Sequence, residues 1–234
     1  MASSPENQRP RTLAIALVLV LLAATAAAFA YTERQKLGRG TVSQPRATHY
    51  FSPECDCEKP TALVTFRLSQ RETLTVRVVG QSGRLVRTLA ERERFRAGPA
   101  ELVWDGRAES GEIVPDGRYF VELQAESRDG TLVFPQPVIV DTVPPRASIR
   151  RVRPTSVPAG EPVSVAYWLS EIGRAVVYVD GVEVAVGERR RIGRVRWDAA
   201  AAEPGPHELT LVGFDLAGNP SEPTEPVEVV IGAP

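Results

Sequence analysis

The chain has 234 residues, enough for one large or two small domains, and a formal net charge of −1. Because nucleic-acid-binding proteins usually carry a clear basic excess, this charge argues against a nucleic-acid partner. The chain holds only two histidines and two cysteines, and its sequence contains none of the common nucleotide-binding, zinc-protease or serine-hydrolase motifs. We therefore expect a protein that is not an enzyme and uses no cofactor.

The first predicted element is an uncharged apolar segment, residues 13–31, which follows a short tail of residues 1–12. As a helix this segment would be about 28 Å long, close to the ~30 Å hydrocarbon core of a bilayer. It is preceded by two arginines and ends in an aromatic residue, as membrane anchors often do. The pattern predicts a single-pass anchor in the cell membrane, with a cytoplasmic tail and an extracytoplasmic remainder. The alternative is a signal peptide cleaved after residue 30, which would also export the chain.

Residues 32–57 are polar, contain glycine and proline, and show no sustained periodicity, which predicts a flexible stalk. The stalk ends in the one unusual local pattern, Cys55-Asp56-Cys57. Because cysteines outside the cytoplasm usually pair, we predict a disulfide between Cys55 and Cys57, although a one-residue gap makes a strained ring. Disulfides between chains, free thiols, a metal site with His49 or Glu54, and redox catalysis remain open as alternatives.

From residue 58 onward, apolar and polar residues alternate in short runs, as in strands that bury one face. Two consecutive prolines in the segment Asp141–Pro145 interrupt the series, because proline cannot continue a central strand. The pattern predicts an all-β fold of two tandem Ig-like β-sandwich domains, residues 58–141 and 142–232. The halves also resemble each other, with Trp104-Asp105 matching Trp197-Asp198 at the end of a strand.

Residues 76–125 carry an ordered set of turn and strand motifs, which are Ser82–Leu89, Ala97-Gly98, Val103–Gly106, Gly111 and Val114–Phe120. This set resembles the Ig-like domain of the flagellar hook-capping protein. The second half resembles the Ig-like repeats of bacterial surface proteins, through Asp141–Pro145 and Asp215–Asn219. The resemblance implies the fold and not the flagellar role, since a hook-capping protein is assembled outside the cell and would not need a membrane anchor.

The resemblance implies that the motif residues serve the fold. They are Trp104, Asp105, Gly106, Gly111, Asp116, Gly117 and Tyr119, with Trp197 in the second half. Trp104 can fill the space between two sheets while its N–H bonds a backbone carbonyl, and the glycines suit turns with positive φ. We expect Asp116 to cap its own turn and Tyr119 to form a tyrosine corner. His207 stands at the matching place in the second half, where we do not expect such a corner.

Two groups of residues are candidates for ligand binding. Asp141, Asp215 and Asn219 can supply oxygen ligands for calcium between the domains, although a simple turn also explains Asp215 and Asn219. The arginine clusters can bind anionic wall polymers or phospholipid, or can simply be solvated strand faces. They are Arg92, Arg94 and Arg96; Arg150, Arg151 and Arg153; and Arg189, Arg190, Arg191, Arg194 and Arg196.

Together these features predict a non-catalytic cell-surface module. It would be attached to the membrane by its N-terminal helix and would contact an unknown protein or cell-wall glycan. The alternatives are a sensor or assembly subunit of a membrane complex, and a secreted accessory module of a cell-wall enzyme.

Overall fold

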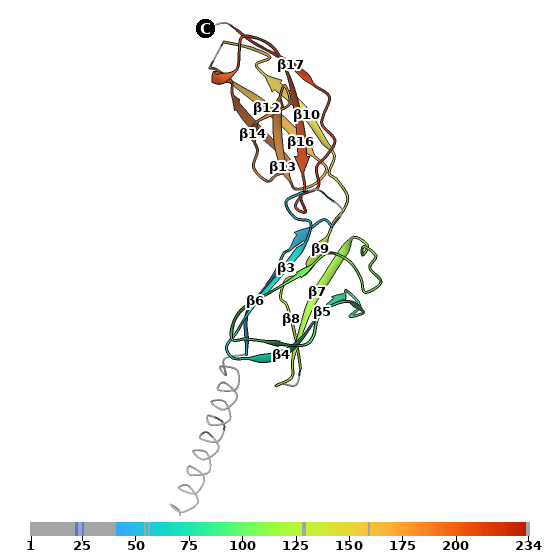
Figure 1. Cartoon of the computed structure of the whole chain (residues 1–234). Helices are drawn as coiled ribbons and strands as arrows, with labels where there is room; N and C mark the ends of the chain where they lie inside the picture. The colour runs from blue at the N-terminus through green and yellow to red at the C-terminus, as the bar shows by residue number, and fades with distance from the viewer. Residues whose placement is uncertain are drawn as a thin grey trace, which may run out of the picture.

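The structure, a computed structural model, describes residues 22, 25, 41–53, 55, 57–127, 130–158 and 160–232. Residues 41–232 form two β-sandwich domains set end to end (Figure 1). The predicted anchor, residues 13–31, lies outside the described residues except for Leu22 and Thr25, which are helical. Within the described part of the chain, no helix combines the length and apolarity that crossing a membrane requires.

The first domain consists of two facing sheets. The smaller sheet has the order β1 (Val42–Ala47), β3 (Ala62–Leu68), β6 (Gly98–Trp104). The larger has the order β2 (Tyr50–Phe51), β9 (Val138–Val140), β7 (Gly117–Ala125), β4 (Glu72–Gly80), β5 (Leu85–Phe95), with β8 (Thr131–Val133) also paired to β7. β2 and β9 run parallel, and the other paired strands of this domain are antiparallel.

The second domain repeats this topology. Its smaller sheet has the order β10 (Ala147–Arg153), β12 (Pro162–Leu169), β15 (Ile192–Asp198). Its larger sheet has the order β11 (Ser156–Val157), β17 (Val227–Ile231), β16 (Gly205–Phe214), β13 (Arg174–Val179), β14 (Val182–Val186), and a 3₁₀ turn, η2 (Ala199–Ala201), follows β15. β11 pairs in parallel with β17, as β2 does with β9. The prediction of two Ig-like β-sandwiches in tandem is confirmed.

Each domain has its own hydrophobic core, because the strands alternate between buried and solvent-facing residues. In β3, for example, Val64, Phe66 and Leu68 are buried while Leu63 and Arg67 are exposed. β12 shows the same alternation in the second domain. Since the apolar residues of each domain form a separate cluster, either sandwich has a complete interior of its own.

The prediction of a stalk through residue 57 is wrong from residue 42 onward, because β1 and β2 lie in this segment and belong to the first domain. Phe51 is fully buried and contacts the Trp104 ring edge-on, with 5.4 Å between ring centroids. The strands escaped prediction for two reasons. β1 is interrupted by a bulge between Ser43 and Arg46, which breaks its alternation, and a strand of two residues has no periodicity to detect.

Candidate functional site at the domain junction

The two predicted core tryptophans are buried, one in each domain. Trp104 is 1% exposed and Trp197 is 5% exposed. The indole N–H of Trp104 donates to the carbonyl of Arg107 at 3.0 Å, and its ring packs edge-on against Tyr119 at 5.2 Å. These contacts place Trp104 in the interior of the first domain and leave it no surface for a ligand.

The turn after Trp104 depends on Asp105 and Gly106. The Asp105 carboxylate accepts a hydrogen bond from the backbone N–H of Arg107 at 3.0 Å. Gly106 has φ +76°, and a Cβ at this position would lie 2.8 Å from the Cβ of Pro53. Only glycine therefore fits here, for conformational and steric reasons. Gly111 and Gly117 also have positive φ, +86° and +156°.

Asp116 does not cap its own turn as expected. Its carboxylate accepts hydrogen bonds from the backbone N–H and the hydroxyl of Thr142, at 3.1 and 3.0 Å. Thr142 follows β9 in the linker to the second domain. Asp116 therefore fixes the start of the linker. The sequence could not reveal this role, because Asp116 and Thr142 lie far apart in the chain.

Both domains have a corner, although only one was expected. The Tyr119 hydroxyl donates to the carbonyl of Pro115 at 2.6 Å. His207 occupies the same place in the second domain, and its Nε2 lies 2.7 Å from the carbonyl of Glu203, also four residues upstream. Its Nδ1 lies 2.6 Å from a carboxylate oxygen of Asp180. His207 thus forms an equivalent of the tyrosine corner in the second domain, because an imidazole N–H can replace the phenol as donor.

The two domains are joined by side-chain contacts as well as by residues 141–146. Lys59 of the first domain donates from Nζ to the carbonyl of Leu216 at 2.7 Å. In the opposite direction, Asn219 of the second domain donates from Nδ2 to the carbonyl of Asp141 at 2.8 Å. An ion pair between Glu58 and Arg174 at 3.6 Å is exposed and contributes little. The two hydrogen bonds connect the end of the first domain and the start of the linker to the loop between β16 and β17 of the second domain.

The predicted cysteine pair lies in this junction. Cys55 and Cys57 are joined by a disulfide, with 5.1 Å between their Cα atoms. The sulfur of Cys57 approaches the carbonyl of Ala217 in the second domain at 3.9 Å. A Cβ on Gly218 would lie 3.1 Å from that sulfur, so glycine at this position permits the close approach of the two loops.

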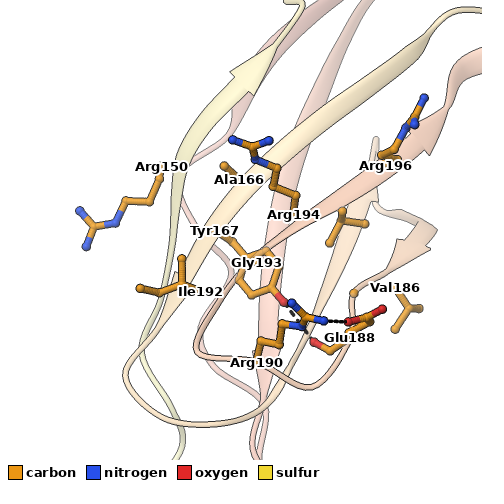
Figure 2. A pocket seen from close by; sticks show the side chains of 12 residues that line it. Arg150, Ala166, Tyr167, Val186, Glu188, Arg190, Ile192, Gly193, Arg194 and Arg196 are labelled. Carbon is orange, nitrogen blue, oxygen red and sulfur yellow. Dashed lines mark hydrogen bonds and ion pairs between the residues drawn. The ribbon is translucent and has the colours of Figure 1, made fainter.

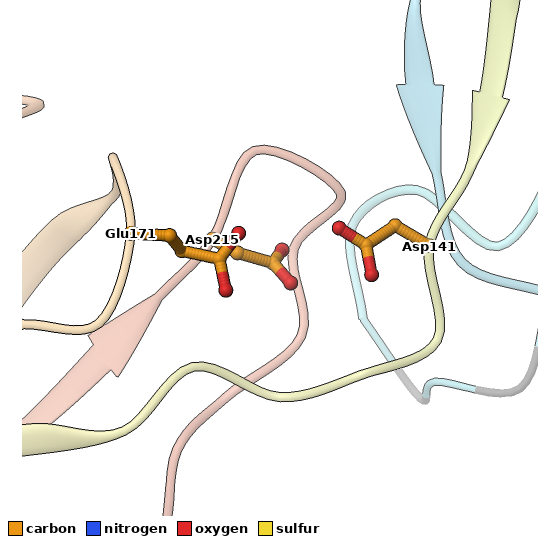
Figure 3. Close-up of side chains that lie close together, drawn as sticks. All are labelled: Asp141, Glu171 and Asp215. Carbon is orange, nitrogen blue, oxygen red and sulfur yellow. The ribbon is translucent and has the colours of Figure 1, made fainter. Parts of the chain in front are cut away.

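Three carboxylates meet beside these contacts (Figure 3). Asp141 comes from the end of β9, Glu171 from the loop after β12, and Asp215 from the loop after β16, and one oxygen of each lies within 4.8 Å of the others. Asp141 and Asp215 are two members of the predicted calcium set. Asn219, the third member of the predicted calcium set, contacts the cluster through its amide nitrogen, because its Nδ2 donates a hydrogen bond to Asp215 at 2.7 Å. Glu171 was missed, since no motif in its loop marks it.

The cluster is electrostatically unfavourable when all three groups are ionised. Burial raises the pKa of Asp141, and the charges of Asp215 and Asp116 raise it further, against a lowering by the hydrogen bond from Val143 N–H. Burial also raises the pKa of Glu171, with added repulsion from Asp141 and Asp215. Three carboxylates are suitable ligands for Ca²⁺, which takes six to eight oxygens, so carbonyls or water would have to complete such a site.

Part of the first domain is similar to a known protein family. Residues 53–129 match the family model described as FlgD Ig-like domain. The chain is 37% identical over 67 residues to the Basal-body rod modification protein FlgD of Salmonella typhimurium, and equally to that of Salmonella typhi. The aligned part covers 29% of this chain and only 28% of either FlgD protein.

The chain is also similar to solved structures that share little of its sequence. The fibronectin(III)-like modules of Clostridium thermocellum CbhA are 16% identical, with a TM-score of 0.47, over 82% of this chain and 94% of theirs. The human OSCAR ligand-binding domain is 13% identical, with a TM-score of 0.36, over 80% of this chain and 97% of its own. The family match and the strand order together lead to one conclusion: residues 53–129 are similar to the FlgD Ig-like domain, and a second β-sandwich with the same strand order follows this domain.

Proposed function

We propose that this chain is a non-catalytic, membrane-anchored module that presents two Ig-like domains in a fixed relative orientation at the cell surface, for contact with a protein or a cell-wall glycan. The observation that carries the proposal is the docking of the loop around Lys59 onto the loop that contains Leu216 and Asn219. Neighbouring domains in one chain usually move relative to each other unless their interface holds them. A docked pair acts as a spacer of defined length and direction.

The strength of the docking fits this role. The net contribution of one hydrogen bond to stability is about 0.5–1.5 kcal/mol, and a hydrogen bond to a charged group contributes about 1.5–3 kcal/mol. The bonds from Lys59 and Asn219 together are then sufficient to favour one arrangement of the domains by more than a factor of ten. The contacts of Cys57 with the opposite loop act in the same direction.

Two features of the sequence support the location. Residues 13–31 are long and apolar enough to span a bilayer as a helix, and a pair of cysteines joined in a disulfide suits an oxidising compartment. The flagellar function of the FlgD proteins is not part of the proposal, because the match spans a small share of their length.

The orientation is tested by distance measurements between spin labels on Arg71→Cys in the first domain and Glu183→Cys in the second. Both positions are exposed. We expect one narrow distance distribution, which broadens when Lys59→Ala and Asn219→Ala are combined with the labels. The matched control is Arg151→Ala with Glu161→Ala, two exposed changes away from the junction, and it should leave the distribution narrow. A broad distribution in the unaltered chain would refute a fixed orientation.

The location and the kind of partner are tested on intact cells. A membrane-impermeant amine reagent should label Lys59, which lies beyond the predicted anchor, and crosslinking followed by mass spectrometry should then identify what the Ig-like domains contact. Crosslinks that run mainly through residues 13–31 would favour the alternative of an assembly or sensor subunit. Recovery of the chain from the medium, without those residues, would favour a secreted accessory module.

A further inference from the structure

One edge strand of the second domain, β15, has neither a bulge nor a proline to hinder strand pairing. β15 pairs with β12 through seven consecutive residues without a bulge, and among the described residues no strand pairs with its other edge. Alternate N–H and C=O groups of an edge strand point away from the sheet, where they can pair with another chain. β15 therefore offers an open backbone edge.

The other long edge strands are interrupted. Bulges or register shifts occur where β1, β5, β10 and β14 meet their neighbours. β6 has an unbroken register but contains Pro99, which has no N–H to donate. Bulges and prolines on edges prevent unwanted pairing. Among the edge strands of four or more residues described, β15 alone has neither.

The side chains on β15 determine which charge a pairing strand should carry. Arg194 and Arg196 are exposed and alternate with the buried Val195 and Trp197, so both arginines lie on the outer face (Figure 2). The same face carries Ile192, which is 70% exposed. Like charges opposite each other disfavour pairing, whereas opposite charges favour it. The arginines therefore oppose pairing with a second copy of β15 and favour an acidic strand.

A hollow of about 630 Å³ lies along this edge. Its lining includes Val186, which is half exposed at the end of β14, and the ring of Tyr167 below Gly193. Glu188 is the only acidic residue of the lining, and it pairs with Arg190 at 2.5 Å. The hollow thus combines apolar contact surface with an excess of positive charge, because Arg150, Arg194 and Arg196 also line it.

We propose that β15 is the docking edge for an acidic, extended segment of a partner protein, which adds as a fourth strand to the sheet β10–β12–β15. Backbone hydrogen bonds to the open edge hold the segment, as in other cases of strand addition. Acidic side chains at alternate positions face Arg194 and Arg196, and an apolar side chain between them enters the hollow beside Val186. The inference rests on the proposed function only for the premise that this chain contacts a protein.

The test uses the full chain in a neutral detergent and a short fluorescent peptide in which glutamate and valine alternate. We expect saturable binding by fluorescence anisotropy at low ionic strength, and slower hydrogen exchange in residues 192–198 when the peptide is bound. The double variant Arg194→Glu with Arg196→Glu should weaken binding about tenfold or more, equivalent to about 1.4 kcal/mol. If the first variant folds poorly, the milder double variant Arg194→Gln with Arg196→Gln should also weaken peptide binding.

Three controls separate strand addition from simple charge attraction. Arg151→Glu with Arg153→Glu makes the same charge change on β10, the other edge of the sheet, and should leave the affinity within about twofold because of screening. A peptide with proline at its centre, and one of equal composition with the glutamates in one block, should both lose binding. The proposal is overturned if no saturable binding occurs, if the blocked peptide binds equally well, or if the two arginine pairs have equal effects. A partner crosslinked in cells would then leave the proposed function standing without this docking edge.

Discussion

The indole of Trp104 lies between the two sheets of the first domain, in edge contact with Phe51 and Tyr119 and hydrogen-bonded to Arg107. Replacing it with alanine would leave a large cavity. We expect Trp104→Ala to destabilise the first domain by about 3–5 kcal/mol, measured by calorimetry, which can resolve the unfolding of two domains. Trp168→Ala is the control, because Trp168 is only half buried, on the outer face of β12. A first-domain transition within a few degrees of that of the unaltered chain would contradict a core role.

His207 gives the second domain a pH-dependent corner. Its two ring nitrogens face two acceptors, Asp180 and the Glu203 carbonyl, so the imidazole satisfies both only when protonated. The hydrogen bond to Asp180 is the main cause of its raised pKa, followed by the bond to Glu203. Correspondingly, the bond from His207 lowers the pKa of Asp180.

The sign of the effect on stability follows from these directions. A raised histidine pKa contributes stability that is fully present below about pH 6.5, the unfolded value, and is lost as the pH rises through the folded value. The lowered pKa of Asp180 contributes stability above about pH 3.9, which is lost on further acidification through the folded value. We expect the second-domain unfolding temperature to fall as the pH rises from about 6 to 8. His207→Tyr, which copies the first domain's corner, should remove that dependence, and an unchanged dependence would contradict the assignment.

The structural roles of residues inside a local sequence motif could be predicted. The roles of residues that contact distant parts of the chain could not. The position of Trp104 at the end of an apolar strand and the spacing of Tyr119 from its turn are local features, visible in the sequence. Asp116 contacts Thr142, and Glu171 meets Asp141 and Asp215, only because the chain folds. For His207 a signal was available: it occupies the place of Tyr119 and retains an N–H donor.

The loop closed by the Cys55–Cys57 disulfide lies at the junction of the two domains. We expect the exported protein, analysed intact without reductant, to be a monomer lighter by two hydrogen atoms than its reduced form. Because the loop is so short, reduction should hardly change the unfolding temperature of the first domain. The spin-label distance distribution should broaden, however, since Cys57 contacts the opposite loop at Ala217. Cys55→Ser with Cys57→Ser is the matched control and should behave as the reduced protein does. A disulfide-linked dimer or two free thiols would contradict the bridge.

The carboxylate cluster predicts a stabilising substitution. The pKa of Glu171 is raised by burial and then by the charges of Asp141 and Asp215, so its ionised form disfavours the folded chain once the pH exceeds the unfolded value of about 4.3. At neutral pH in EDTA, Glu171→Gln should stabilise the chain by a few tenths of a kcal/mol, because solvent screens a partly exposed group. The measurement is thermal unfolding, with Glu161→Gln as the exposed control.

The same variant tests for a bound cation. If added calcium raises the unfolding temperature of the unaltered chain and Glu171→Gln reduces this gain, the cluster holds the ion. A lower unfolding temperature for Glu171→Gln in EDTA would contradict the repulsion itself.

Strands with clear alternation, such as β3, β4 and β12, were predictable because burial of one face leaves a period of two in the sequence. The first-domain strands β1 and β2 could not be predicted, because they lack such a period. Their place is fixed by pairing with β3 and β9, which are distant in sequence, and a bulge removes the local pattern. The fold class was therefore accessible at once, and the start of the first domain was not.

For the whole molecule, the state of the N-terminus separates an anchored protein from a secreted one. We expect residues 13–31 to remain in the mature chain, since their length suits a membrane span. Peptide mapping of the protein extracted from membranes should recover peptides that precede residue 13. Ala30→Leu removes a small residue that signal peptidase would need and should change nothing. A mature chain that begins at Tyr31 would contradict the anchor.

The parallel pairs β2–β9 and β11–β17 determine how the molecule would respond to a pulling force. In each domain the first strand of the larger sheet lies beside the last and runs in the same direction. A pull on the two ends of a domain draws such neighbours past each other, so that it loads their hydrogen bonds together instead of opening them one at a time. If one end is tethered and a partner pulls on the other, both domains receive the load in shear. The repeated topology therefore places two such parallel pairs in series along the chain.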